Sequence, residues 1–341
     1  MIVQITMTRN ELFLIKELMS QWQKYADAFV FMDDCSTDGT YEYLMDHKDE
    51  FNILEVLKTE YPGQPTNMES VVRQRLFDEA YKHSGNIVCL DTDEYFDGLA
   101  TKEMIEEGLE SNKDVLFHAP WIQYTDTNEI RVDGPWGHNL KDRIGSYDDR
   151  GVFNDASMHS EHMPVPANQG MIDLPTLFIA HLQWLDKKTV AVKQYYWKIV
   201  DYVNKIEHGV DIIPASEYDV SVNNFEWNYA QFDFPLKVRS DVYNLHDIEN
   251  SYKYNFIKES IEKYNIPNQE GIKFERKFPP LMGKEFGILT NSGSSSNLLM
   301  MSALTSKRGA NLPKGTKVIT PIAGFPTTIN PIFQVGFEPA F

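Results

Sequence analysis

Short apolar runs alternate with segments of helical spacing over about the first hundred residues of the chain. Each apolar run ends at a cluster of polar residues, which is typical of buried strands in an open sheet. In the intervening segments, apolar residues recur every three or four positions, as on one face of a helix. The predicted strands are Ile2–Met7, Ala28–Met32, Ile53–Leu57 and Ile87–Leu90, and the predicted helices are Glu11–Tyr25 and Glu69–Lys82. This βαβ order predicts an α/β fold with its chemistry at the carboxyl ends of the strands.

The pattern changes from about Ser111, where the sequence becomes rich in aromatic and polar residues and loses clear periodicity through Tyr147–Gln169. Long loops of this composition commonly line a site. Helical spacing returns at Lys187–Asn204 and Tyr252–Tyr264. Several prolines and glycines follow, which is typical of a linker. We therefore predict a domain over residues 1–265, a linker over 266–287 and a distinct βαβ-like segment over 288–341.

Composition limits the classes of partner. The chain has 341 residues and a formal charge of −18, so broad contact with nucleic acid or anionic lipid is disfavoured by repulsion. A divalent metal can still bridge an acidic protein to an anionic nucleotide. No apolar run of about 18 residues occurs and no leader precedes the first strand, so we expect a cytoplasmic protein. Peripheral association with a membrane-bound acceptor, at the inner face of the membrane, stays open. Cys35 and Cys89 are expected to be reduced thiols.

Two acidic turns follow predicted strands. The first is Asp33-Asp34-Cys35-Ser36-Thr37-Asp38-Gly39-Thr40, and the second is Asp91-Thr92-Asp93-Glu94. In an extended Asp-x-Asp the two carboxylates point to the same face, so both can reach one metal–diphosphate unit. Acidic residues also populate turns for purely conformational reasons. The order and spacing of the two motifs favour a site for Mn²⁺ or Mg²⁺ and a nucleoside diphosphate.

These motifs, together with Thr8-Arg9-Asn10-Glu11, resemble the family 2 glycosyltransferases, especially a bacterial subgroup with an Arg-Asn-Glu start and an Asp-x-Asp-Glu motif. The resemblance implies a GT-A fold, a mixed and mostly parallel sheet flanked by helices, and inverting transfer from a nucleotide-diphosphate sugar. It further implies that one group of residues binds the nucleotide sugar and that Asp91 and Asp93 hold the metal. The implied nucleotide-sugar residues are Thr8, Glu11, Asp33, Asp34, Arg73 and Asp91.

The catalytic base and a further metal ligand are less well defined by sequence. An inverting transferase needs a carboxylate to take the proton of the acceptor hydroxyl. Glu161, which lies between two histidines, and Asp142 are the candidates, and Glu161 is equally compatible with a solvated loop. Transferases that this chain resembles often use a late histidine as a metal ligand, which suggests His181. A histidine in an apolar run is also often a buried core residue.

The pattern of the C-terminal segment predicts a strand, then a Ser/Gly turn, and then an apolar helix. The helix is predicted over Leu298–Leu304. It resembles the pyridoxal-phosphate-dependent sugar aminotransferases, closest to their deoxysugar 3-dehydrase branch. The resemblance implies that Gly293, Ser294 and Ser295 correspond to the turn that binds the cofactor phosphate, and that Phe325 flanks the pyridine ring. Residues 288–341 supply no cofactor lysine, so we expect a vestigial or partial unit that needs a complete domain to use PLP.

The sequence therefore predicts a metal-dependent glycosyltransferase acting on a saccharide or lipid-linked saccharide in bacterial surface polysaccharide or lipopolysaccharide assembly. One alternative is a non-catalytic sugar-nucleotide-binding or scaffold protein. A second is a nucleotidyltransferase, although Thr6–Asn10 is not the Gly-rich basic loop expected there. A third, if the chain is a fragment, is part of a PLP-dependent enzyme of deoxysugar biosynthesis.

Overall fold

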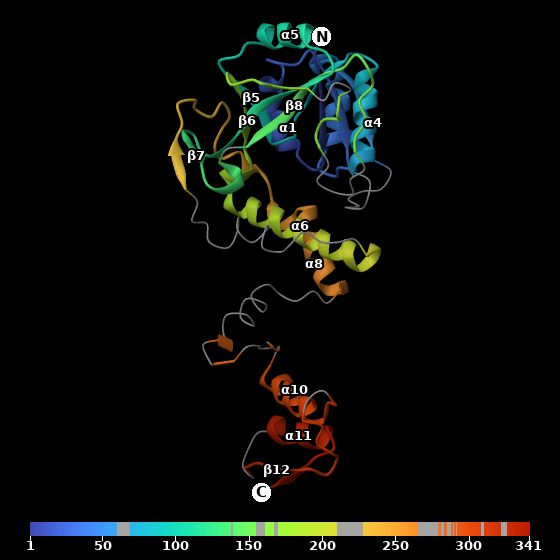
Figure 1. Ribbon diagram of the computed structural model, residues 1–341, viewed down its shortest axis with the longest axis vertical. Coiled ribbons are helices and arrows are strands. Elements are labelled where there is room, and N and C mark those ends of the chain that lie inside the picture. Colours follow the sequence, from blue (N-terminus) through green and yellow to red (C-terminus); the bar gives the residue numbers. More distant parts are fainter. Residues whose placement is uncertain are drawn as a thin grey trace. The chain divides into compact units, whose positions relative to one another are not determined.

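The computed structural model divides the chain into two compact units, Met1–Tyr264 and Asn265–Phe341 (Figure 1). The structure describes residues 1–59, 69–137, 139–154, 161–166, 170–209 and 228–264 of the first unit. In the second unit it describes residues 279–280, 283–284, 288, 290, 292–307, 310–321 and 326–341. The predicted linker falls mainly outside the described residues.

Four parallel strands form one half of the sheet in the first unit. They are β1 (Val3–Thr8), β2 (Ala28–Asp33), β3 (Ile53–Lys58) and β4 (Asn86–Cys89). β1 pairs with β2 on one side and with β4 on the other, and β3 pairs with β2. All four predicted strands are confirmed, with ends that differ by one residue. Their carboxyl ends meet at one edge of the sheet because the strands run parallel.

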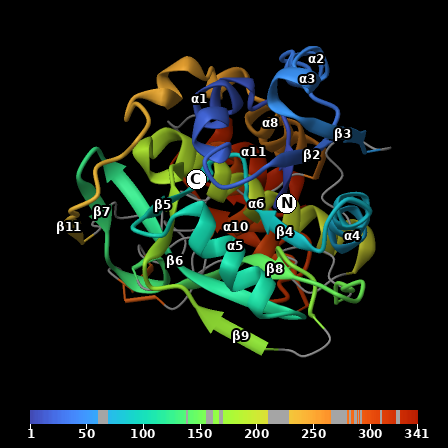
Figure 2. The same cartoon turned by 90° about the horizontal axis from the view of Figure 1, so that it is seen from above.

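Helices cover both faces of these strands. α1 (Leu12–Trp22) and α4 (Glu69–Tyr81) confirm the two predicted helices. Successive residues of β2 alternate between faces, so that Phe29 and Phe31 pack with α1 while Val30 and Met32 pack with α4. Figure 2 shows the short helices α2 (Thr40–Asp46) and α3 (Lys48–Phe51) beside β3, at the end of the parallel half.

The other half of the sheet mixes both strand directions, which confirms a mixed α/β architecture. β8 (Leu140–Ser146) pairs antiparallel with β4 and with β6 (Val115–Asp126). β10 (Leu177–His181) runs parallel to β6 and antiparallel to β5 (Glu94–Gly98). The remaining elements are α5 (Lys102–Ser111), β7 (Glu129–Arg131), η1 (Gly134–Trp136), β9 (Gly170–Asp173) and β11 (Tyr229–Gln231).

The pairing of β10 with β5 decides where the site lies. β5 begins directly after the acidic turn, and in the antiparallel register His181 lies opposite Glu94. The last residue of β10 therefore arrives beside Asp91-Thr92-Asp93. The next residues form η2 (Gln183–Leu185), and α6 (Lys187–His208) starts after Asp186, whose carboxylate accepts the amide of Thr189.

Two helices complete the first unit. α6 packs against α8 (Tyr252–Tyr264), and both were predicted from their periodicity (Figure 1). Two short 3₁₀ turns, η3 (Val242–Leu245) and η4 (Ile248–Asn250), precede α8. Among the described residues, no helix is both long and apolar enough to cross a bilayer.

The second unit is a small α/β arrangement. α10 (Gly293–Thr305) confirms the predicted apolar helix and starts earlier than expected, at the Ser/Gly turn. β12 (Lys317–Ile319) pairs in parallel with β13 (Glu338–Ala340), and α11 (Pro326–Gln334) lies between them in sequence.

Candidate functional site

The carboxyl ends of β1 and β2 carry two buried polar atoms without a hydrogen-bond partner in the part of the chain that the structure describes. Thr8 lies opposite Asp33 in the parallel register, and Asp33 is fully buried. Within the described residues, Oγ1 of Thr8 and Oδ1 of Asp33 are both unpaired. The other oxygen of Asp33 accepts the amide of Ser36 at 3.1 Å. Because buried polar groups are normally paired, these two unpaired atoms mark a candidate binding position for a polar ligand.

The loops that follow β1 and β2 hold each other in place. Asn10 and Cys35 both have a φ of +53°, in the left-handed region that few non-glycine residues adopt. The amide of Asn10 donates to Oγ of Ser36 at 2.9 Å, and the amide of Thr37 donates to Oδ1 of Asn10 at 2.6 Å. Such backbone conformations persist where surrounding contacts impose them, and they cluster at functional sites.

Asp34 differs from Asp33 because both of its oxygens have protein partners. Oδ2 accepts Nη1 of Arg9 at 3.0 Å, and Oδ1 accepts the hydroxyl of Thr59 at 2.5 Å. The guanidinium of Arg9 in turn lies 4.0 Å over the ring of Tyr252. Of the two adjacent acids, Asp33 is therefore the one with an oxygen that has no partner among the described residues.

Asp91, at the start of the acidic turn, is paired with two basic side chains. Its Oδ2 lies 3.0 Å from Nε2 of His162, and its Oδ1 lies 3.9 Å from the guanidinium of Arg73. Burial alone would raise the pKa of Asp91. His162, Arg73 and Arg143 together hold that pKa well below its usual range. Asp91 is therefore a carboxylate at neutral pH.

Asp93 faces two further cationic or potentially cationic groups. Its Oδ2 lies 3.1 Å from Nζ of Lys193 and 3.4 Å from Nε2 of His181. Burial would raise the pKa of Asp93, but Lys193 and His181 lower it far below its usual value. Asp93 is almost completely buried, so this charge depends on its partners.

His181 is oriented by a second contact on its other nitrogen. Nδ1 lies 2.5 Å from Oε1 of the buried Gln123, and the ring stacks on Trp121 with centroids 4.6 Å apart. An amide oxygen accepts, so Nδ1 carries a proton, and Nε2 is the ring nitrogen that faces Asp93. A buried partner that fixes the tautomer in this way is typical of histidines that bind metal.

Asp93 and His181 fit a divalent cation in both donor type and spacing. A separation of 3.4 Å suits two ligands of one ion. No three His, Cys, Asp or Glu side chains converge in the part of the chain that the structure describes. Mg²⁺ bound with phosphates commonly uses one or two carboxylates and completes its shell with phosphate oxygens and water. The carboxylate of Asp91, the third predicted metal ligand, instead contacts His162 and Arg73.

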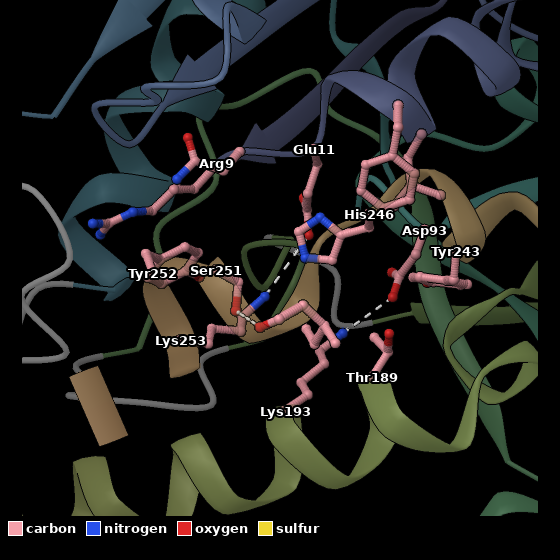
Figure 3. Close-up of a pocket in the computed structure, with 14 residues that line it drawn as sticks. Arg9, Glu11, Asp93, Thr189, Lys193, Tyr243, His246, Ser251, Tyr252 and Lys253 are labelled. Carbon is pink, nitrogen blue, oxygen red and sulfur yellow. Dashed lines mark hydrogen bonds and ion pairs between the residues drawn. The ribbon is translucent and has the colours of Figure 1, made fainter. Parts of the chain in front are cut away.

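A small pocket adjoins Asp93 (Figure 3). Its volume is about 30 Å³, and Glu11, Lys193 and Lys253 project into it from three separate elements. Burial raises the pKa of Glu11, while the ammonium of Lys253, 3.9 Å from Oε1, opposes that shift. The pocket thus contains two carboxylates matched by two ammonium groups. A wider groove of about 640 Å³, lined in part by Asn10, Thr37 and His246, lies next to it and shares several residues with it.

The two candidate bases lie in different surroundings. Glu161 is exposed and accepts a hydrogen bond from Asn154 at 3.4 Å, while its neighbour His162 contacts Asp91. Asp142 lies 2.9 Å from Nε2 of His118. The segment that carries Glu161 therefore borders the site, whereas Asp142 belongs to a different cluster of side chains.

The Ser/Gly turn of the second unit is the start of a helix. Ser292 caps α10, and its Oγ accepts the amide of Ser295 at 3.2 Å. Gly293 and Ser294 form the first turn of this 13-residue helix, a position that suits phosphate. One of the amides that a phosphate would use is thus already paired. Phe325 lies outside the described residues.

Three polar residues that pair with Asp91, Asp93 or His181 were not anticipated from the sequence: His162, Lys193 and Gln123. Lys193 alone had a usable signal, because it lies on the apolar face of α6, one turn after the buried Thr189 and one turn before the buried Tyr196. The other two depend on pairings between segments that are distant in sequence.

Comparisons with known proteins bear on the C-terminal segment. Residues 260–341 match the model of the DegT/DnrJ/EryC1/StrS aminotransferase family, which confirms the predicted resemblance there. The dTDP-4-dehydro-2,6-dideoxy-D-glucose 3-dehydratase of Saccharopolyspora spinosa is 49% identical over 71 residues, 20% of this chain and 15% of that protein. The lipopolysaccharide biosynthesis protein RfbH of Salmonella typhimurium is 50% identical over 70 residues, 20% of this chain and 16% of that protein. The chain spans about a sixth of the length of these relatives.

Solved structures of S. aureus TarS are similar to this chain at a low level. One TarS structure has a TM-score of 0.36 and 16% identity, covering 64% of this chain and 41% of that chain. TarS 1–349 in complex with UDP-GlcNAc has a TM-score of 0.34 and 14% identity, covering 83% of this chain and 86% of that chain. Similarity at this level assigns no role to the residues of the site.

Proposed function

We propose that the first unit is a metal-dependent glycosyltransferase that moves a sugar from a nucleotide-diphosphate donor to an acceptor hydroxyl. The observation that carries this proposal is the placement of open polar atoms and metal-compatible ligands at one edge of the sheet. Thr8 and Asp33 offer the unpaired atoms, and Asp93 with His181 offers the ligands. In parallel α/β sheets, this edge is where nucleotides bind.

The nucleoside would lie against the ends of β1 and β2. The hydroxyl of Thr8 and the open oxygen of Asp33 would hydrogen-bond its base or ribose, with Glu11 and Arg73 nearby. Asp93 and His181 would hold the divalent cation, and a site containing imidazole favours Mn²⁺ over Mg²⁺. The cation, when bound, would neutralise charge that develops on the departing diphosphate.

We propose Glu161 as the base that accepts the proton of the acceptor hydroxyl, in an inverting displacement. Support comes from its neighbour His162, which contacts Asp91 and so brings this segment to the site. Asp142 is the second candidate, and its pairing with His118 makes it less available for proton transfer. The acceptor we propose is a saccharide or lipid-linked saccharide, reached by peripheral association where it is membrane-bound.

The proposed pathway is assembly of bacterial surface polysaccharide or lipopolysaccharide. Its support is the C-terminal match to sugar aminotransferases and to a protein named for lipopolysaccharide biosynthesis. Gly293 and Ser294 would contribute to binding the phosphate of PLP only within a complete aminotransferase domain. We therefore assign the transfer reaction, and not PLP chemistry, to the residues of the first unit.

A thermal-shift panel of UDP-, GDP-, CDP- and dTDP-sugars, with and without Mn²⁺, tests the proposal. One donor at about 100 times its dissociation constant should stabilise the wild type by about 2.7 kcal/mol, and only with metal. Asp93→Asn should abolish the shift, while Asp126→Asn, at the exposed end of β6, should retain it. If no nucleotide sugar stabilises the wild type with any metal, the proposed function is wrong.

A further inference from the structure

The ammonium of Lys193 contacts the carboxylate oxygen of Asp93 that also faces His181. Its Nζ lies 3.1 Å from Oδ2 of Asp93 (Figure 3). The same oxygen faces Nε2 of His181 at 3.4 Å. An ammonium and a divalent cation on one carboxylate oxygen would repel each other strongly in this nearly buried setting. A divalent cation bound through this oxygen would therefore compete with the ammonium of Lys193.

The fold directs Lys193 into the site. It lies on α6 between the buried Thr189 and Tyr196, and about a quarter of its side chain is exposed. The start of α6 is fixed by the Asp186 cap. Lys193 is consequently presented to Asp93 by the packed face of a long helix, unlike the exposed lysine Lys188 near the start of the same helix.

The pocket beside this pair is too small for a nucleoside diphosphate. About 30 Å³ holds roughly one water molecule. Lys193 and Lys253 fill the space by pairing with Asp93 and Glu11. A diphosphate entering here would offer both ammonium groups new anionic partners, and would leave Asp93 free for a cation.

We propose that Lys193 is the resting counter-ion of Asp93 and moves to the donor diphosphate when the divalent cation and donor bind together. This inference rests on the proposed function. It makes Lys193 a diphosphate-binding residue and makes cation binding dependent on the donor. The free protein accordingly binds divalent cations weakly. Replacing Lys193 with an uncharged residue removes the ammonium that competes with the cation for Asp93.

The test measures Mn²⁺ binding to the donor-free protein by loss of the free-ion EPR signal. Lys193→Met should bind Mn²⁺ at least about tenfold more tightly than the wild type, because a neighbouring positive charge has been removed. Lys193→Arg, which keeps the charge, and Lys188→Met, on the exposed face of α6, should both match the wild type. Lys193→Gln serves as the neutral variant if Lys193→Met does not fold, as judged by circular dichroism.

A second measurement separates this inference from the proposed function. The nucleoside diphosphate that stabilises the wild type should bind Lys193→Met with at least about tenfold lower affinity, since a charge-assisted contact is lost. Unchanged Mn²⁺ affinity in folded Lys193→Met and Lys193→Gln, with nucleotide binding intact in the wild type, would overturn the role of Lys193 alone. Absence of nucleotide binding to the wild type would instead overturn the proposed function, whatever the Lys193 variants do.

Discussion

Arg143 holds both carboxylate oxygens of Glu94, each at 2.9 Å, and both side chains are buried. Glu94 also accepts the amide of Asp91 at 3.1 Å and the indole N–H of Trp121 at 2.8 Å. The last acid of the Asp-Thr-Asp-Glu motif thus fixes the shape of the acidic turn. Its oxygens are occupied within the protein, so we regard Glu94 as a positioning residue.

Replacing Glu94 with Gln should lower the free energy of unfolding by about 3–5 kcal/mol, because Arg143 would be left as an uncompensated buried charge. Urea unfolding followed by circular dichroism measures the loss. The matched control is Glu249→Gln, whose exposed pairing with Lys188 should change stability by at most about 1 kcal/mol. Equal effects of the two substitutions would show that the Glu94–Arg143 pair does not support the turn.

Replacing Thr8 with Val should separate stability from binding. The buried hydroxyl has no partner among the described residues, so an isosteric methyl should leave stability unchanged or raise it by up to about 1 kcal/mol. Affinity for the stabilising nucleotide should fall by about tenfold, the value of one hydrogen bond of about 1.4 kcal/mol. Chemical denaturation and isothermal titration calorimetry measure the two effects. Reduced stability with unchanged affinity would contradict a ligand-binding role for this hydroxyl.

Replacing Gln123 with Met should weaken Mn²⁺ binding, although Gln123 is not itself a proposed metal ligand. Gln123 orients His181, and loss of such an outer contact typically lowers metal affinity about 10–100-fold. The measurement is Mn²⁺ affinity in the presence of a saturating nucleoside diphosphate. Gln23→Met, at an exposed position, is the control. Wild-type Mn²⁺ affinity in Gln123→Met would remove His181 from the proposed ligand set.

The two cysteines should differ sharply in reactivity. Cys89 is buried beside Arg73, and burial raises the pKa of its thiol to about 12 despite that neighbour. A disulfide reagent at pH 8 should therefore modify Cys35 in the native protein and both cysteines after denaturation. Two rapidly reacting thiols in the native protein would contradict the burial of Cys89.

The same thiol contributes a pH dependence of stability. Its pKa is raised in the folded state, so the folded protein retains a proton that the unfolded chain loses above about pH 9. The contribution of the Cys89 thiol to the free energy of unfolding is fully present below the pKa of the thiol in the unfolded chain. It decreases as the pH rises toward 12. Cys89→Ala should reduce the slope of unfolding free energy against pH between about pH 9 and 11.

Local sequence patterns were sufficient for the elements that surround the site. β1 to β4, α1, α4, α6 and α8 follow from the spacing of apolar residues, because each element buries one face or both faces against the same core. The acidic motifs were likewise visible, since the ends of predicted strands mark the edge where chemistry gathers. The roles assigned to Thr8, Asp33, Asp91 and Asp93 stay predictions until ligands are tested.

Other features depended on pairings that periodicity does not encode. The position of His181 follows from the antiparallel register of β10 with β5, and a shift of one residue would turn its side chain to the other face. Asp33 and Asp34 look equivalent in sequence, but only the surrounding contacts leave an oxygen of Asp33 open.

By itself, the sequence determined the α/β framework, the acidic edge and the aminotransferase-like C-terminal segment, because these depend on residues that are close together along the chain. Only the tertiary structure decided that Lys193 pairs with Asp93 and that His162 pairs with Asp91. Those pairs join residues 100 and 71 positions apart. Their geometry is set by the packing of whole helices and strands, which no local pattern of residues specifies.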